Sequence, residues 1–297
     1  METQKTILIT GITGNQGSAV TKHLLGQGYS IIGLTRNANS EKAKLWETKG
    51  VKIVEGNLDE PNSYQAHVEN VDVIFLVQTL QRKENEIKQG KEFIDAICLT
   101  NNTHLVYSSV LGADLNTGVP HFESKFVIEN YIKSKNLSHT ILRPASFYEN
   151  HLIPQVANGI KKGKYVSPLN KTCRQQMIGI DDIGKIAGKV IVDSEKYHNK
   201  TISIATDEWI IGEVPQAFSQ AMNIDIKYKK LPGFITLLAM GKDLSKMFKY
   251  MNKHNFSVIE NIDAVKNEFE IKGNFRSWIL ENFKDDIGET NHNSRKS

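Results

Sequence analysis

Three evenly spaced glycines lie near the start of the chain, directly after a short apolar run. Glycine in such a turn allows a sharp exit from a strand, a close approach of the backbone to a pyrophosphate and tight packing of the next helix. A helix that starts near Asn15 would also point free N–H groups and a positive dipole end at the anion. We therefore predict a dinucleotide site, with a glycine-rich turn that binds nothing as the alternative. The expected contacts are Gly11, Thr13, Gly14, Asn15, Gln16 and Gly17.

The residues after the second predicted strand, 30–35, indicate which dinucleotide binds. An NAD site has Asp or Glu about 20 residues beyond the glycines, whereas this chain has Arg36 and Asn37 there. A guanidinium offers a bidentate fork to a 2′-phosphate, and we expect no carboxylate beside it to repel that phosphate. NADP is therefore predicted, with Lys44 as a second cation. A plain surface charge at a strand end is the alternative for Arg36.

Further strands are predicted at 51–54, 71–77, 104–108 and 139–142, and they alternate with helices that include 86–99 and 122–134. Six strands in this order predict an α/β Rossmann fold with a doubly wound parallel sheet. Ligands of such sheets bind outside the carboxyl ends of the strands. We interpret the helix at 86–99 as a core contact only. Further cofactor contacts are expected from Asn57, Leu58, Gln78, Thr79 and Leu80.

Four stretches together resemble the NmrA-like branch of the atypical short-chain dehydrogenase/reductases: 13–17, 34–37, 87–91 and 142–150. The resemblance implies an NADP-preferring protein of two domains. Its relatives include NADP-sensing regulators, reductases of quinones or dyes, and more distant isoflavone-type reductases. It also implies that the segment after residue 143 lines the nicotinamide half of the cleft, through Pro144, Ser146, Phe147 and Tyr148.

Ordinary members of that superfamily use Tyr-x-x-x-Lys, a spacing that puts both side chains on one helical face. The phenol transfers a proton, and the ammonium lowers the phenol's pKa and holds the nicotinamide ribose. Tyr131 and Lys135 have this spacing, but they fall in the last turn of the predicted helix, and we interpret them as a chance match. The position that aligns with the family has His121 and Lys125.

Three roles are open for these two residues. Lys125 anchors the ribose and His121 is a solvated residue, which gives a cofactor-binding regulator, the function we predict. Alternatively, His121 donates a proton while NADPH reduces a small apolar acceptor such as a quinone, dye or carbonyl. In the third case Lys125 is itself the base, as in the isoflavone-type branch. Ser108 and Ser109 lie near the superfamily's substrate-polarising serine, or only end their strand.

We predict that the cofactor domain spans 1–150 plus about 181–205. A smaller, discontinuous α+β lobe for a substrate or partner spans about 151–180 plus 206–290, and 291–297 is a polar tail. Asp181 or Asp182 is expected to cap a helix, and 201–205 to rejoin the main sheet. The apolar and Met-rich stretch 234–251 is predicted to be core, with a mobile lid or a partner surface as alternatives.

The composition is that of an ordinary globular protein: 297 residues, 39% hydrophobic, 24% charged and a net charge of +4. The short basic clusters at 161–164 and 227–230 do not predict direct contact with nucleic acid. No signal peptide or long apolar run is found, so we expect a cytoplasmic protein that does not contact a membrane. Cys98 and Cys173 are expected to be free thiols, and no metal site is predicted. A small-molecule substrate and a protein partner both stay open, and the sequence does not indicate an oligomeric state.

Overall fold

A computed structural model describes residues 4–100 and 103–283 of the chain. The chain divides into two compact units. The first contains the residues up to Pro144 and Ile180–Ser203, and the second contains Ala145–Gly179 and the residues from Ile204 on. The predicted boundary at residue 150 lies after the observed one, so residues 145–150 belong to the second unit. The predicted tail at 291–297 lies outside the described residues.

The first unit is built on a seven-stranded sheet with the order β10-β6-β5-β4-β1-β2-β3. The strand pairs from β3 across to β6 are all parallel, and the order reverses beside β1, as in a doubly wound sheet. The predicted α/β Rossmann fold is therefore confirmed, including the return of the segment near 201–205 to the main sheet. The strands are β1 (Thr6–Thr10), β2 (Ser30–Thr35), β3 (Lys52–Glu55), β4 (Val73–Leu76), β5 (His104–Ser108), β6 (His139–Pro144) and β10 (Lys200–Ile204).

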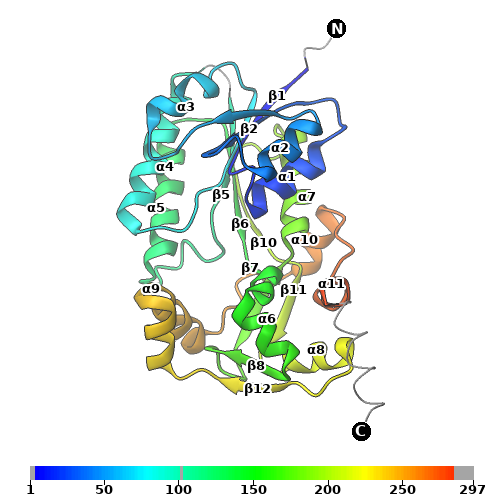
Figure 1. Ribbon diagram of the computed structural model, residues 1–297. Coiled ribbons are helices and arrows are strands. Elements are labelled where there is room, and N and C mark those ends of the chain that lie inside the picture. The colour runs from blue at the N-terminus through cyan, green and yellow to red at the C-terminus, as the bar shows by residue number, and fades with distance from the viewer. Residues whose placement is uncertain (1–3, 101–102, 284–297) are drawn as a thin grey trace. The chain divides into compact units, whose positions relative to one another are not determined.

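Helices cover both faces of this sheet, with α3, α4 and α5 on one face and α1, α2 and α7 on the other (Figure 1). Helices α1 and α7 pack closely, since a Cβ at Gly184 would lie 2.6 Å from the backbone carbonyl of Ala19. The helices are α1 (Asn15–Leu24), α2 (Glu41–Thr48), α3 (Pro61–Val68), α4 (Lys83–Cys98), α5 (Pro120–Ser134) and α7 (Ile180–Val192).

The start of α7 differs from the prediction. The helix begins at Ile180, so Asp181 and Asp182 lie in its first turn and not at the N-cap position. Asp181 instead forms an ion pair with Lys22 of α1 at 2.7 Å and contacts His23 at 3.1 Å. Hydrogen bonds from these two side chains hold the pKa of Asp181 well below its usual range. A carboxylate in a first turn also interacts favourably with the helix dipole.

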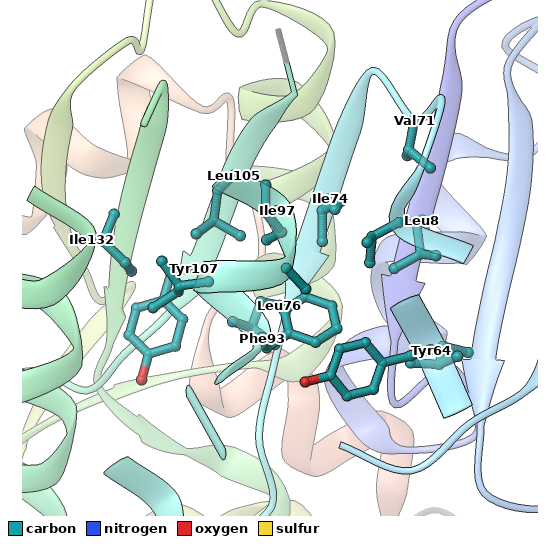
Figure 2. Packing of buried hydrophobic residues seen from close by; sticks show 14 of the residues in the cluster. Leu8, Tyr64, Val71, Ile74, Leu76, Phe93, Ile97, Leu105, Tyr107 and Ile132 are labelled. Carbon is teal, nitrogen blue, oxygen red and sulfur yellow. The ribbon is translucent and has the colours of Figure 1, made fainter. Parts of the chain in front are cut away.

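The core of the first unit lies between the sheet and α3, α4 and α5 (Figure 2). Strand β4 is buried along its whole length and so is β5, as expected where helices cover both faces of a parallel sheet. Tyr64 and Phe93 pack at 4.8 Å between ring centroids in this core. These two strands are therefore enclosed by packed side chains.

The second unit contains two small sheets, in the orders β11-β9-β7 and β12-β8. Its core is aromatic and surrounds His151, which packs on Phe275 at 5.0 Å and on Phe218 at 5.4 Å between ring centroids. Its strands are β7 (Ser146–Phe147), β8 (Lys164–Ser167), β9 (Arg174–Ile178), β11 (Asp207–Ile210) and β12 (Lys227–Lys230). Its helices are η1 (Tyr148–Leu152), α6 (Pro154–Lys161), α8 (Val214–Met222), α9 (Gly233–His254), α10 (Ile262–Glu268) and α11 (Phe275–Asn282).

Helix α9 corrects the prediction that 234–251 is core. Phe234 is 67% exposed and Leu238 82% exposed, whereas Met251, at the far end of the segment, is buried. Gly241 has φ 80° and ψ 174°, which interrupts the helix between these two parts. The apolar composition of the first part therefore does not reflect burial inside its unit.

Among the described helices, none has both the length and the apolar character that a membrane crossing requires. Within the same residues, no group of three or more His, Cys, Asp or Glu side chains is arranged to hold a metal ion. Cys98 is exposed and Cys173 is buried, and both are free thiols.

Candidate functional site

The glycine-rich turn between β1 and α1 has a geometry that requires glycine. Gly11 has φ +59°, and a Cβ at Gly17 would lie 2.4 Å from the carbonyl oxygen of Gly11. The N–H of Gly14 donates to that same carbonyl at 2.8 Å, which closes the turn. Gly14 is the N-cap of α1, and having no side chain it cannot cap the helix itself. The first N–H groups of α1 are thus suited to an anion.

Side chains tie this turn to two strands. The hydroxyls of Thr13 and Thr35, at the end of β2, are 3.4 Å apart. Gln16 accepts a hydrogen bond from the Ser108 hydroxyl, at the end of β5, at 2.7 Å. Asn15 is exposed beside them. The structure therefore brings Thr13, Asn15, Gln16 and the glycines together, and the Ser108 hydroxyl is engaged by the turn itself.

A carboxylate from the neighbouring strand β3, which the sequence analysis missed, bonds the loop after β2. Arg36, Asn37 and Lys44 are exposed, as a phosphate site requires. However, Glu55, at the end of β3, accepts a hydrogen bond from the N–H of Ala38 at 3.2 Å. A carboxylate of the neighbouring strand therefore bonds the loop that carries Arg36, which the sequence analysis did not consider. The parallel register of β2 and β3, which pairs Glu55 with Thr35, could have indicated this carboxylate.

The cofactor contacts predicted after β3 and β4 differ in whether their side chains are free to meet a ligand. Asn57 organises its own turn, because its side chain donates to Glu60 at 3.0 Å and accepts from the N–H of Asp59 at 3.1 Å. Leu58 is half-buried against the core. Thr79 and Leu80 are exposed.

Gln78, in contrast, points into the protein. Its amide group donates to the carbonyl of Glu86 and to the side chain of Gln89, both at 2.9 Å. Its side-chain oxygen accepts from the Tyr107 hydroxyl at 3.2 Å. Burial, together with the charges of Glu86 and Glu129, holds the pKa of Tyr107 well above its usual range, so the phenol is a donor at neutral pH. Only the backbone of Gln78 can therefore face a ligand.

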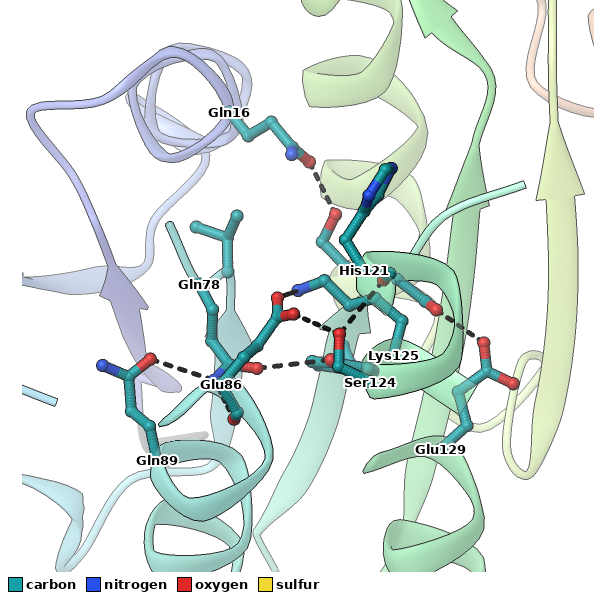
Figure 3. Close-up of polar contacts among 12 residues, drawn as sticks. Gln16, Gln78, Glu86, Gln89, His121, Ser124, Lys125 and Glu129 are labelled. Carbon is teal, nitrogen blue, oxygen red and sulfur yellow. Dashed lines mark hydrogen bonds and ion pairs between the residues drawn. The ribbon is translucent and has the colours of Figure 1, made fainter. Parts of the chain in front are cut away.

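A buried ion pair joins α4 to α5 at the predicted catalytic position (Figure 3). The ammonium of Lys125 lies 2.9 Å from Glu86 Oε1, and the side chain of Glu86 is completely buried. Ser124 donates to the other oxygen of the same carboxylate. The ammonium also lies 5.2 Å from the centroid of the Tyr107 ring, within range of a cation–π contact. Glu86 belongs to α4, which the sequence analysis interpreted as a core contact only, and its ion pair with Lys125 corrects that interpretation.

His121 lies in the first turn of α5, four residues before Lys125, and is half-buried. Its ring packs edge-on against Phe122 at 4.8 Å between centroids. The competing string at Tyr131 and Lys135 lies at the other end of α5, where both side chains bind Asp95 of α4, at 2.8 Å and 2.7 Å.

A second buried carboxylate lies one helical turn beyond Lys125, at Glu129. Arg143 donates to it through Nε at 2.9 Å and through Nη2, and its Nη1 donates to Asp114. Ser109 donates to the same carboxylate at 2.6 Å. The Ser109 hydroxyl is therefore part of this network, which fixes the end of β6 to α5.

The segment predicted to line the nicotinamide half is divided between the units. Pro144 ends β6 and accepts a hydrogen bond from Leu111 at 2.9 Å. Ser146 and Phe147 form β7 of the second unit. Tyr148 is buried in that unit, where its hydroxyl bonds Asp207 and Thr206. The Tyr148 side chain therefore has no exposed surface for a cofactor, which corrects its predicted role.

Comparisons with known proteins agree on the family and the fold. The model of the NmrA-like family matches residues 3–275. The photosystem II assembly factor Ycf39 of Trieres chinensis is 24% identical over 284 residues, which cover 91% of this chain and 87% of the relative.

Two solved structures have a similar fold. The Citrobacter sp. triphenylmethane reductase, complexed with NADP(H), aligns with a TM-score of 0.79 and 18% identity over 93% of this chain and 99% of the other. Nmra, described as a negative transcriptional regulator, also aligns with a TM-score of 0.79 and 18% identity, over 98% of each chain. Since the family model matches most of the sequence, the chain belongs to the NmrA-like family.

Proposed function

We propose that the first unit binds NADP(H) and that the protein is a redox-sensing regulator. The observation that carries the proposal is the turn at 11–17, where a Cβ at Gly17 would collide with the Gly11 carbonyl. A turn of this kind, placed where the strand order of the sheet reverses, is suited to a pyrophosphate. The family membership and the relatives solved with NADP(H) or NAD support the same cofactor class.

The choice of NADP over NAD is proposed to depend on Arg36, with Lys44 as a second cation. Both are exposed at the expected end of β2 and on α2. Glu55 opposes them, since a carboxylate near a 2′-phosphate is repulsive. The balance of these charges would set the ratio of the two affinities.

Binding without turnover is supported by the side chains at the catalytic position. No phenol stands four residues before Lys125, where His121 is found, and the Ser108 hydroxyl is bonded to Gln16. One structural relative is described as a negative transcriptional regulator, which supports a regulatory role.

The second candidate is an NADPH-dependent reductase of a small apolar acceptor. His121 favours it, because an imidazole in the first turn of α5 shares the helix with Lys125 and can donate a proton near neutral pH. NADPH would supply a hydride to the acceptor, and His121 would supply the proton to the acceptor's reduced atom. The similar fold of the Citrobacter sp. triphenylmethane reductase supports this candidate.

Calorimetric titration with NADP⁺ and NAD⁺ tests the cofactor. We expect Arg36→Ala to weaken NADP⁺ binding about ten- to a hundredfold and to leave NAD⁺ binding unchanged, because a charge-assisted hydrogen bond contributes about 1.5–3 kcal/mol. Glu55→Gln is the matched variant, because it removes a negative charge where Arg36→Ala removes a positive one, and it should strengthen NADP⁺ binding. A wild-type protein that binds neither dinucleotide would contradict the proposal.

Absorbance at the NADPH band, followed with a panel of quinones and triphenylmethane dyes, separates the two candidates. A flat trace together with tight NADPH binding supports the regulator. Turnover that is lost in His121→Phe and in Lys125→Ala would instead support the reductase.

A further inference from the structure

Glu86 is a buried carboxylate to which the sequence analysis assigned no role. We infer that Glu86 is a positioning residue: it holds the Lys125 ammonium in place to bind the nicotinamide ribose. The inference rests on the proposed cofactor binding. Lys125 is the group that would contact the ligand, and Glu86 would act only through it.

The burial of the pair argues for a role beyond stability. The Glu86 side chain is fully buried and that of Lys125 is 11% exposed. Removing two charges from water is costly, and well-packed apolar side chains in their place are often as stabilising or more so. Stability alone therefore does not explain why α4 carries a carboxylate here.

The geometry fixes the ammonium from two directions. Glu86 reaches from α4 to two successive residues of α5, with one oxygen on Lys125 and the other accepting from Ser124. The face of the Tyr107 ring lies 5.2 Å from the same ammonium. Figure 3 shows the Lys125 and Ser124 side chains both directed at the carboxylate.

The arrangement leaves donors for a ligand. An ammonium has three N–H groups, and the 2.9 Å ion pair with Glu86, which lacks hydrogen-bond geometry, occupies at most one of them. Across residues 4–100 and 103–283, no other hydrogen-bond acceptor contacts Lys125 Nζ. Two donors are therefore available for vicinal ribose hydroxyls.

The same pairing selects among the roles considered for Lys125. If the amine were neutral, the carboxylate of Glu86 would be buried without a counter-charge, which is strongly unfavourable. The pair therefore favours the ammonium as an anchor over a free amine as a base.

The backbone of Glu86 is itself anchored to the end of the sheet. Gln78, just beyond β4, donates to the backbone carbonyl of Glu86 at 2.9 Å. Gln89, one turn later in α4, accepts from Gln78 and donates to Asp59 at 2.9 Å. These bonds fix the first turns of α4, so Glu86 is rigidly placed before any ligand binds.

The experiment compares two ligands in the full chain. NADPH contains the nicotinamide ribose, whereas adenosine 2′,5′-bisphosphate contains only the adenosine end. We expect Glu86→Gln to weaken NADPH binding about tenfold and to leave the affinity for the bisphosphate unchanged, because only the Lys125 contact is disturbed. Glu86→Asp should recover part of the loss. In a double-mutant cycle, adding Glu86→Gln to Lys125→Met should weaken NADPH binding no further.

A matched control lies on the same two helices. Glu123 of α5 pairs with Lys83 of α4 at 2.7 Å, but both side chains are about one-third exposed. Glu123→Gln should leave both affinities at their wild-type values. If Glu86→Gln does not fold, Ser124→Ala, which removes the second bond to the carboxylate and a contact with the His121 carbonyl but keeps the ion pair, should still weaken NADPH binding about threefold.

Three outcomes would overturn the inference. Wild-type affinity for NADPH in Glu86→Gln, with both ligands binding the wild type, would refute the role of Glu86 alone. Equal loss of both ligands would indicate a general structural effect. A wild type that binds neither ligand would remove the proposed function and the inference with it.

Discussion

Two buried carboxylates on neighbouring helices, Glu86 and Glu129, lie in different surroundings. Both side chains are fully buried, and a serine hydroxyl donates to each. Arg143 binds Glu129 through two nitrogens and uses a third on Asp114. Lys125 offers Glu86 a single contact. A planar guanidinium fixed in this way has little left for a ligand, whereas an ammonium keeps free donors. The Arg143–Glu129 pair therefore serves the structure, whereas the Lys125–Glu86 pair is suited to a ligand-binding site.

Replacing Arg143 should reduce stability more than any other change considered, because it breaks the hydrogen-bond network around Glu129. Arg143→Met leaves Glu129 buried without a counter-charge, and we expect a loss of about 3–5 kcal/mol in the free energy of unfolding. Lys125→Met also leaves a buried carboxylate without a counter-charge, and we expect it to cost less, about 3 kcal/mol, because Lys125 makes one contact where the Arg143 guanidinium makes three. Urea denaturation of both variants measures the difference. A larger loss in Lys125→Met would reverse the assignment of the two pairs.

Acid provides the next test, because buried neutral histidines respond to it differently from ion pairs. Burial lowers the pKa of His104, in the first unit, to about 4, and lowers that of His151, in the second, to the same value. The unfolded chain takes up these protons near pH 6.5 and the folded chain only near pH 4. Stability should therefore fall as the pH drops from 6.5 towards 4, by on the order of 3 kcal/mol for each histidine.

Thermal denaturation from pH 7 to pH 5 measures this loss, and His151→Phe is the informative variant. His151 donates through Nδ1 to the carbonyl of Tyr148 at 2.8 Å, and its Nε2 lies 3.2 Å from the Tyr165 hydroxyl. Phenylalanine loses those bonds but cannot take up a proton, so its stability should depend less on pH. An unchanged slope in His151→Phe would mean that other groups cause the acid loss.

The parts of the molecule that the sequence predicted depend on local patterns. The turn at 11–17 and strands such as β2 and β5 follow from glycine spacing and short apolar runs. Glu55, Glu86 and Glu129 were missed because a carboxylate in a polar helix or at a strand end looks like a surface charge until its tertiary partner is known. Two other predictions misjudged which side chains are buried. The apolar start of α9 is exposed, and Tyr148 is buried, since composition does not say which face an element presents.

The two serines that donate to the buried carboxylates allow the most closely matched test of the two pairs, with the smallest change in stability. Ser109→Ala and Ser124→Ala each remove one hydrogen bond to a buried carboxylate, and each should cost about 1.5 kcal/mol of stability. Only Ser124→Ala should also weaken NADPH binding, since only Glu86 holds a side chain with donors left for the ribose. Ser109→Ala should bind NADPH as the wild type does. If both variants weakened NADPH binding equally, the two carboxylates would support the cofactor site alike, and the distinction between a structural and a functional pair would be lost.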